Sequence, residues 1–338
     1  MQDRQFAGYD VIGDIHGHAD ELVGLLGELG YSESPQPSHP RQQGLWSHPL
    51  RQAIFVGDLI DRGPQQVRTV DLVRSMVEAG SARMVLGNHE FNAIAWATRD
   101  PEVPGDHLRT HLGERGEKNR HQHEEFLQQV GGDSPLHHDY IAWFRSLPLW
   151  IELDAGLRVV HACWDQRSMD LLKPLLAADH SLTRQALVEG SRKGSPQYEA
   201  IEVILKGPEI DLPDTHHYCD KDGNVRRRAR MRWWDPNATT LRQVAELLEG
   251  TNGPDGGVLS PVPETPLDAG VHQPYTEAVP VAFGHYWRSP ATAICTATTV
   301  CVDYSAGSGG PVVAYRWSGG PFDETQLVGF PSLEQSTR

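Results

Sequence analysis

The sequence contains no long apolar run, and its four cysteines are too few in 338 residues for a disulfide framework. A helix that crosses a membrane needs roughly 18 or more consecutive apolar residues, so a membrane-spanning role is excluded. No two cysteines form a CxxC pair, and we expect all four to be buried, reduced thiols: Cys163, Cys219, Cys295 and Cys301. The first ten residues carry charges without an apolar stretch, which predicts a cytoplasmic location.

Basic residues are scarce relative to acidic ones. The chain has 30 Lys and Arg against 45 Asp and Glu, which gives a formal net charge of -15. This charge repels polyphosphate backbones and disfavours a protein that coats nucleic acid. It does not exclude a small phosphorylated ligand, because bound metal cations would reverse the local field. The hydrophobic fraction of 38% is that of a globular protein with a sizeable core.

The N-terminal half alternates short apolar runs with helical patterns, which is typical of βαβ units on a largely parallel sheet. We expect strands at 9–13, 53–56 and 83–86, with helices at 20–29 and 65–79. Each strand ends in a loop, and the three loops read GDIHG, GDLIDRG and GNHE. Ligands of open α/β sheets bind at the carboxyl ends of strands, so these loops predict a single site.

The remainder of the chain predicts a single domain over 1–338. Within it we expect a polar surface insertion at about 98–135 and a mostly helical region at about 165–250. A hairpin at 149–162 is followed by β-rich runs from 279 to 317, which predict a second, mostly antiparallel sheet. The predicted fold is therefore a four-layer α/β/β/α sandwich, with two mixed sheets flanked by helices.

The side chains in these loops are types that bind transition metals. Asp14 and His16 flank one residue at the end of a strand, so both can grip one ion. Asp58 ends the next strand, and its two oxygens can bridge two ions about 3.5–4 Å apart. Three further donors follow along the chain: Asn88, His161 and His285. Mixed oxygen and nitrogen donors favour Mn, Fe, Zn or Co over Ca.

Each donor taken singly has a simpler interpretation. Asp14, Asp58 and Asn88 could each cap the helix that follows. His161 and His285 could each be ordinary hydrogen-bonded core histidines. The recurrence of a donor residue beside glycines in three successive strand-end loops favours a shared site.

In their order, these motifs resemble those of the calcineurin-like metallophosphoesterases, in the phosphoprotein-phosphatase branch. The resemblance extends from about Tyr9 to about Trp317 and leaves the 98–135 insertion unmatched. It implies two divalent ions, with manganese the first expectation. The implied ligands are Asp14, His16 and Asp58 for one ion, and Asp58, Asn88, His161 and His285 for the other. It also implies that a metal-bridging hydroxide attacks a phosphate monoester in line.

The resemblance gives roles to three neighbouring residues. His89 would protonate the leaving oxygen as general acid, and Asp61 would fix its tautomer. Arg62 and Asn88 would contact the substrate phosphate. Asp61 and Arg62 could instead form a salt bridge within the turn. Arg232 is a candidate second phosphate clamp, or else belongs to a solvated basic run.

Substrate cues point in two directions. Asp61, Arg62 and Glu90 resemble protein Ser/Thr phosphatases, whereas the segments 230–233 and 281–285 resemble symmetrical bis(5'-nucleosyl)-tetraphosphatases. The expected partner is thus a phosphorylated small molecule, a nucleotide or a phosphoprotein. A non-catalytic metal-binding scaffold is the alternative from another class.

The insertion contains four histidines that invite comparison with a third metal site: His107, His111, His121 and His123. No carboxylate or cysteine accompanies them at recognisable ligand spacing. We therefore expect these histidines to lie on a solvated helical face.

Overall fold

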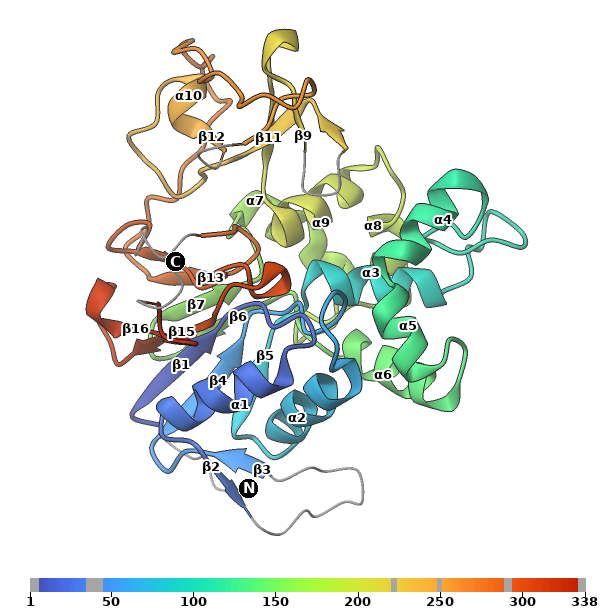
Figure 1. The fold of residues 1–338 in the computed structure, drawn as a ribbon, viewed down its shortest axis with the longest axis vertical. Coiled ribbons are helices and arrows are strands. Elements are labelled where there is room, and N and C mark those ends of the chain that lie inside the picture. Colours follow the sequence, from blue (N-terminus) through green and yellow to red (C-terminus); the bar gives the residue numbers. More distant parts are fainter. Residues whose placement is uncertain (1–5, 35–44, 220–223, 248–250, 289–293, 334–338) are drawn as a thin grey trace. The chain divides into compact units, whose positions relative to one another are not determined.

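The computed structural model describes residues 6–34, 45–219, 224–247, 251–288 and 294–333. The chain divides into two compact units, whose elements are labelled in Figure 1. The larger unit comprises residues 1–205 and 279–338, and the smaller unit comprises residues 206–278. The sequence predicted one domain over 1–338. The smaller unit buries a cluster of its own, which includes Leu212, Ala229 and Leu241.

The first sheet of the larger unit has the strand order β16-β15-β1-β4-β5. Its strands are β1 (Gly8–Ile12), β4 (Arg51–Phe55), β5 (Ala82–Met84), β15 (Val312–Trp317) and β16 (Leu327–Phe330). Strands β1, β4 and β5 run parallel, whereas β15 and β16 pair antiparallel. Helix α1 (Ala19–Glu28) packs against β15 and β16, and α2 (Gln66–Glu78) packs against β5, so both cover one face (Figure 1).

The second sheet has the order β14-β13-β7-β6. Its strands are β6 (Trp150–Leu153), β7 (Leu157–Val160), β13 (Val281–Phe283) and β14 (Thr299–Cys301). Two of its three pairings are parallel, and only the β6–β7 hairpin is antiparallel. The expectation of a mostly antiparallel second sheet is therefore wrong. An apolar run predicts a strand without naming its partner, and β15 pairs with β1 in the first sheet instead.

The main core lies between the two sheets. One buried cluster combines Val11 and Ile54 of the first sheet with Val159, Ala282 and Val300 of the second. Three helices follow β7 in sequence: α7 (Gln166–Leu172), α8 (Arg184–Gly190) and α9 (Pro196–Lys206). The carbonyl of one α9 residue accepts the first two N–H groups after His161. The predicted four-layer α/β/β/α sandwich is confirmed.

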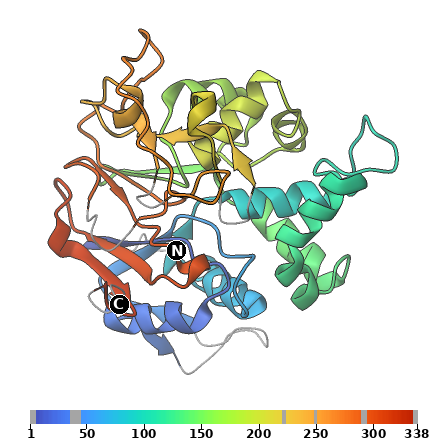
Figure 2. The same ribbon diagram turned by 45° about the horizontal axis from the view of Figure 1, so that its top comes forward.

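A helical group follows the third strand-end loop. It consists of α3 (Asn88–Ala97), α4 (Gly113–Gln122), α5 (Glu124–Val130) and α6 (Pro135–Arg145). Their teal and green ribbons gather beside α2 in both views (Figures 1 and 2). Helix α5 packs against both α2 and α6, with the ring of Phe126 fully buried near Tyr140 and Phe144. The C-terminal part of the 98–135 segment therefore packs against α2 and α6 instead of standing free.

The smaller unit is built from short strands. They are β8 (Glu209–Asp211), β9 (Tyr218–Cys219), β10 (Val225–Arg226), β11 (Arg228–Met231) and β12 (Ala245–Glu246), with one short helix, α10 (Leu241–Val244). Strand β11 pairs antiparallel with both β8 and β12. Of the region expected to be mostly helical, 165–250, only the part up to α9 is, because short strands predominate after it and α10 has four residues. Gly207, at φ 84°, and Pro208 follow α9 and end it.

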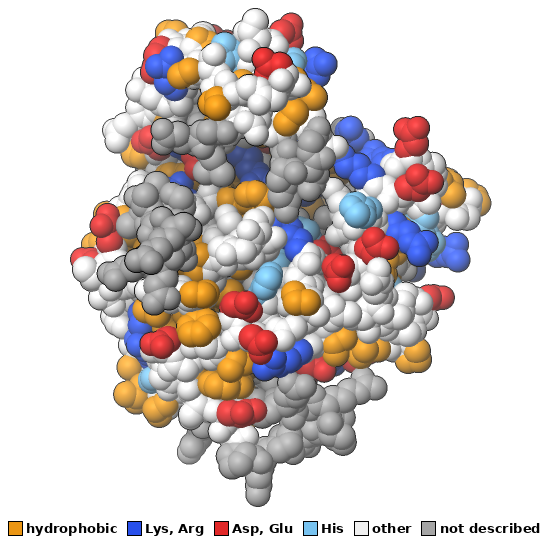
Figure 3. Space-filling model, viewed as in Figure 1, with side chains coloured by type: hydrophobic (Ala, Val, Ile, Leu, Met, Phe, Trp, Pro, Cys, Tyr) orange, Lys and Arg blue, Asp and Glu red, His pale blue; other side chains and the backbone are white. Residues whose placement is uncertain are grey.

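None of the helices in the described part of the chain is long and apolar enough to cross a bilayer. On the face drawn in Figure 3, acidic and basic side chains are interspersed.

The four cysteines differ in burial. Cys163 and Cys301 are buried, as expected, whereas Cys219 and Cys295 are partly exposed.

Candidate metal centre

The six predicted metal ligands all lie in the larger unit, at the ends of strands. They are Asp14 and His16 after β1, Asp58 after β4, Asn88 at the start of α3, His161 after β7 and His285 after β13. The structure leaves each of these side chains only 0–7% exposed. At this depth a carboxylate needs a partner of opposite charge or a bound cation, and an imidazole needs hydrogen-bond partners or a metal ion. The two sheets therefore bring together residues that are 271 positions apart in sequence.

Asp58 is shared by two triads of potential ligands. One contains His16, Asp58 and His89, and the other contains Asp58, His161 and His285, with ligand atoms within 4.8 Å of one another. Oδ2 of Asp58 lies 3.8 Å from Nε2 of His16, 3.9 Å from Nε2 of His89 and 3.5 Å from Nε2 of His161. The two longer separations exceed a hydrogen bond, and all three fit an ion held by bonds of about 2.0–2.2 Å. The donor set therefore suits two metal ions around one carboxylate.

The histidine tautomers also suit metal binding. Nδ1 of His16 lies 2.9 Å from the carbonyl of Ile60, and Nδ1 of His161 lies 2.7 Å from the carbonyl of Val56. When Nδ1 donates its hydrogen to a carbonyl, Nε2 carries the lone pair and faces Asp58, so it can bind a cation held there. Burial, assisted by His89 and Arg62, lowers the pKa of His16 well below its usual value and keeps the ring neutral.

Asn88 and Asp14 lie at the sides of the triads. Oδ1 of Asn88 is 3.0 Å from Nε2 of His161. Both carboxylate oxygens of Asp14 lie 3.3 Å from the backbone N–H of His285. Burial, together with Asp303 and Asp58, raises the pKa of Asp14 well above its usual value. Several buried carboxyl groups close together form an environment that a divalent cation would stabilise.

The backbone of the site adopts rare conformations. Five of the eight non-glycine residues with positive φ in the described chain are predicted site residues: His16, Asp58, Asp61, Arg62 and His285, at φ 50–74°. Each such residue costs about 1–3 kcal/mol and persists only where its surroundings fix it. The glycines allow close approach here, since a Cβ on Gly57 would lie 2.5 Å from the backbone nitrogen of Gly87. The second and third loops thus pack backbone against backbone.

Glu90 holds these two loops together, a role that the sequence analysis missed. Its fully buried carboxylate accepts N–H groups from Asp58 and Leu59, both at 2.8 Å, and from Gly87 at 3.2 Å. Burial, with the nearby Asp58 carboxylate, raises the pKa of Glu90 to about 7. A local signal existed, because a glutamate at the third position of a helix is the second half of a capping box.

The predicted Asp61–His89 pair is present in the structure. Nδ1 of His89 lies 2.5 Å from Oδ2 of Asp61, and its Nε2 faces Asp58. Arg62 turns the other way, and its guanidinium lies 5.3 Å from the ring centre of Trp287. Within the described residues Asp61 and Arg62 form no salt bridge, and Nη1 of Arg62 is buried without a hydrogen-bond partner. Consecutive left-handed backbones send these two neighbours in different directions.

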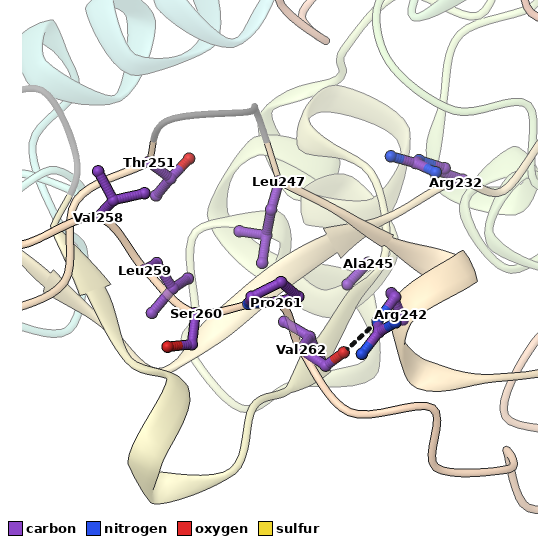
Figure 4. A pocket seen from close by; sticks show the side chains of 10 residues that line it. All are labelled: Arg232, Arg242, Ala245, Leu247, Thr251, Val258, Leu259, Ser260, Pro261 and Val262. Carbon is purple, nitrogen blue, oxygen red and sulfur yellow. Dashed lines mark hydrogen bonds between the residues drawn. The ribbon is translucent and has the colours of Figure 1, made fainter.

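Arg232 lies in the smaller unit. Its Nε pairs with Glu246. With Arg242 and mainly apolar side chains it lines a cavity of about 450 Å³, drawn in Figure 4. In that view Arg242 bonds to the carbonyl of Val262. A phosphate contact by Arg232 stays a prediction.

The insertion histidines differ from their expected solvated face. His121 is exposed, but His107 and His111 are half-buried, and their rings stack successively on Trp96. His123 is only 4% exposed, and its Nδ1 lies 2.6 Å from Oδ1 of Asp61. The solvated-face prediction is therefore wrong for His123. Asp61 lies 62 residues away in sequence, so no local sequence pattern could have predicted the contact.

A family model described as calcineurin-like phosphoesterase matches residues 9–212, more than half of the chain. The chain belongs to the calcineurin-like phosphoesterase family. The predicted family is confirmed, and its members are hydrolases that act on phosphoric ester or anhydride bonds. The matched region contains five of the six predicted ligands and ends before His285.

Several relatives of this calcineurin-like phosphoesterase are bis(5'-nucleosyl)-tetraphosphatases. The asymmetrical enzyme PrpE of a Geobacillus species is 49% identical over 81 residues, which cover 24% of this chain and 30% of that protein. Its Bacillus velezensis counterpart is 32% identical, covering 46% of this chain and 55% of that protein. The symmetrical enzyme of Klebsiella pneumoniae is 25% identical over 97% of this chain and 95% of that protein. The chain thus spans about a third to a half of the length of these asymmetrical relatives.

Two solved phosphatase structures are also similar. A protein serine/threonine phosphatase from Saccharomyces cerevisiae gives a TM-score of 0.49 at 12% identity, over 97% of this chain and 80% of that one. A cold-active protein-tyrosine phosphatase from a Shewanella species gives a TM-score of 0.39 at 15% identity, over 92% of this chain and 75% of that one. At such values neither structure indicates a substrate.

Proposed function

We propose that this protein is a hydrolase that cleaves phosphoric ester or anhydride bonds with two divalent ions held around Asp58. The supporting observation is the sharing of one buried carboxylate by two triads of potential ligands. The proposed ligands are Asp14, His16 and Asp58 for one ion, and Asp58, Asn88, His161 and His285 for the other. Manganese is our first choice, with Fe, Zn or Co as alternatives, because all accept mixed oxygen and nitrogen donors.

Two ions bound there would lower the pKa of a bound water and neutralise charge on the phosphoryl group. Arg62 would add a permanent positive charge beside them. Its side chain and that of His16 both border Gly307. A Cβ added to this glycine would lie 2.7 Å from Cδ of Arg62 and 2.7 Å from Cδ2 of His16. Its buried Nη1 has no partner among the described residues, so it is ready to donate to a phosphoryl oxygen.

His89 would protonate the leaving oxygen through Nε2. Asp61 accepts the Nδ1 hydrogen of His89 and fixes the orientation of the ring. Although burial opposes it, His123 and His89 hold the pKa of Asp61 below its usual value, so this carboxyl is an anion. An anionic acceptor at Nδ1 holds the ring in the orientation that a general acid needs.

A general acid matters most when the leaving group is a poor one. An alcohol leaving a phosphate monoester must be protonated as the bond breaks, whereas a nucleoside diphosphate leaves readily as an anion. The Asp61–His89 pair therefore favours monoesters of alcohols, the class to which phosphoserine and phosphothreonine belong. This preference makes a Ser/Thr-phosphatase-like activity our first substrate proposal.

Symmetrical cleavage of dinucleoside tetraphosphates is the second candidate. The observation that favours it is the alignment with the symmetrical tetraphosphatase of Klebsiella pneumoniae, which covers 97% of this chain. Such a reaction would use the same ions and Arg62, with less dependence on His89.

Product analysis distinguishes the two candidates. The manganese-loaded protein is incubated separately with a phosphoserine peptide and with diadenosine tetraphosphate. Phosphate released from the peptide alone supports the monoesterase, and ADP as the sole nucleotide product supports the symmetrical tetraphosphatase. Hydrolysis of neither compound nor of 4-nitrophenyl phosphate, with Mn, Fe, Zn or Co, would refute the proposal. Asp58→Asn serves as the inactive control.

A further inference from the structure

We propose that His123, supplied by the insertion, is a positioning residue for the general acid and acts on His89 through Asp61. This inference rests on the proposed function and deepens it. The two carboxylate oxygens of Asp61 are divided between the two histidines. Oδ2 lies 2.5 Å from Nδ1 of His89, and Oδ1 lies 2.6 Å from Nδ1 of His123. A His–Asp–His chain therefore extends from the insertion to the metal centre.

The environment of His123 fixes its ring. The residue lies between α4 and α5 and is 4% exposed. Its imidazole packs on Phe126, with ring centres 4.9 Å apart, and edge-on to Trp96 at 6.5 Å. Nδ1 faces an anionic carboxylate, so it carries the hydrogen and donates it. Aromatic contacts on two sides and one charged hydrogen bond leave the ring a single orientation.

Asp61 needs this support because its own conformation is strained. Its φ is 69°, in the left-handed region that non-glycine residues rarely adopt. Its backbone N–H donates to the side chain of Gln66 at 2.7 Å. The backbone N–H of Gln66 in turn donates to Gln129 of α5 at 2.8 Å. The insertion thus supports Asp61 twice, through Gln129 and through His123.

Loss of the His123 donor would leave Oδ1 of Asp61 buried without a partner. A buried acceptor in that condition costs about 1–3 kcal/mol, and a charged one costs more. The carboxylate would rotate or shift toward other donors, and Oδ2 would move from Nδ1 of His89. The general acid would then be misaligned, while the ligands around Asp58 would stay in place. The expected defect concerns protonation of the leaving group and spares metal binding.

The variant His123→Phe keeps an aromatic ring of similar size and removes the donor. We expect its kcat on phenyl phosphate, whose leaving group is poor, to fall about 10–100-fold, as for other residues that orient a functional group. On 2,4-dinitrophenyl phosphate, whose leaving group needs little protonation, the fall should stay below about 3-fold. His123→Asn can donate from nearly the same position and should recover most of the rate. The exposed neighbour His121→Phe is the matched control and should behave as wild type.

A cycle with His89→Ala tests the route of the effect. If His123 acts only through His89, adding His123→Phe to His89→Ala should cause no further loss of kcat on phenyl phosphate. Equal losses on both esters, or no recovery in His123→Asn, would overturn the inference. So would a further loss in the double variant. A wild-type protein that hydrolyses neither ester would instead refute the proposed function itself.

Discussion

The carboxylate of Glu90 accepts the backbone N–H of Asp58 at 2.8 Å, and Asp58 in turn accepts the backbone N–H of His89 at 3.0 Å. The second strand-end loop and the first turn of α3 are thus joined in both directions. Asp58 also caps α3, so the cap interpretation and the ligand interpretation of this residue are compatible. Its side chain caps the helix after the third loop, not the helix that follows Asp58 itself.

This arrangement predicts that Glu90→Gln destabilises the site. An amide offers one acceptor oxygen where three N–H groups converge, so one donor would face an NH2 group. We expect the free energy of unfolding to fall by about 1–3 kcal/mol, and metal affinity to fall about 10–100-fold. Thermal unfolding and metal content after dialysis measure both effects. Glu125→Gln, at an exposed position of α5, is the control, and equal stability of the two variants would contradict the prediction.

Asp58→Asn tests the shared carboxylate. The amide keeps the hydrogen bond from His89, but it lacks the negative charge that would bridge two ions. We expect fewer than two bound ions per chain and a loss of activity of about 100-fold or more. Elemental analysis of the dialysed protein, with Asp154→Asn in an exposed turn as control, measures the first effect. Two retained ions in Asp58→Asn would exclude a bridging role.

The strand-end loops could be predicted because each is a contiguous pattern. The GDIHG, GDLIDRG and GNHE segments each place a donor residue directly after an apolar run, and the parallel strands then gather them at one edge. The pairing of β15 with β1 could not be predicted in the same way. Tyr9 lies opposite Trp317, and only the assembled core determines that register.

Contacts that support a site residue from a distant part of the sequence likewise could not be predicted. His123 looks like any polar histidine in a charged helical stretch until folding places it against Asp61. The left-handed backbone of Asp61 and Arg62 is another example. Asp adopts it only occasionally and Arg rarely, so the surrounding contacts impose it. Local patterns predicted the donors, and tertiary contacts determine how they are held.

His89→Ala separates two roles that the geometry allows for this residue. His89 belongs to a ligand triad, yet its Nδ1 is held by Asp61 in the manner of a general acid. As a general acid, its loss should leave two ions bound and lower kcat on phenyl phosphate by about 100–10,000-fold. The loss should be smallest with a nitrophenyl ester. Full rate on phenyl phosphate, or loss of an ion, would reject the general-acid assignment.

His137 predicts a pH dependence of stability that does not involve the metal centre. Its ring is buried, and Nδ1 accepts the backbone N–H of Asp133 at 3.2 Å. Burial, with His123 and His138, lowers the pKa of His137 to about 4. The folded state therefore favours the neutral ring, so this contribution is complete above the unfolded pKa of about 6.5 and is lost as pH falls toward 4.

His137→Asn keeps an acceptor for Asp133 and cannot be protonated in this range. Between pH 6.5 and 4, wild type should lose on the order of 3 kcal/mol more stability than this variant, since one pKa unit corresponds to about 1.4 kcal/mol. Denaturant unfolding at several pH values measures the difference. His121→Asn, at an exposed position of α4, should keep the wild-type slope. Equal slopes for wild type and His137→Asn would show that His137 is not the titrating group.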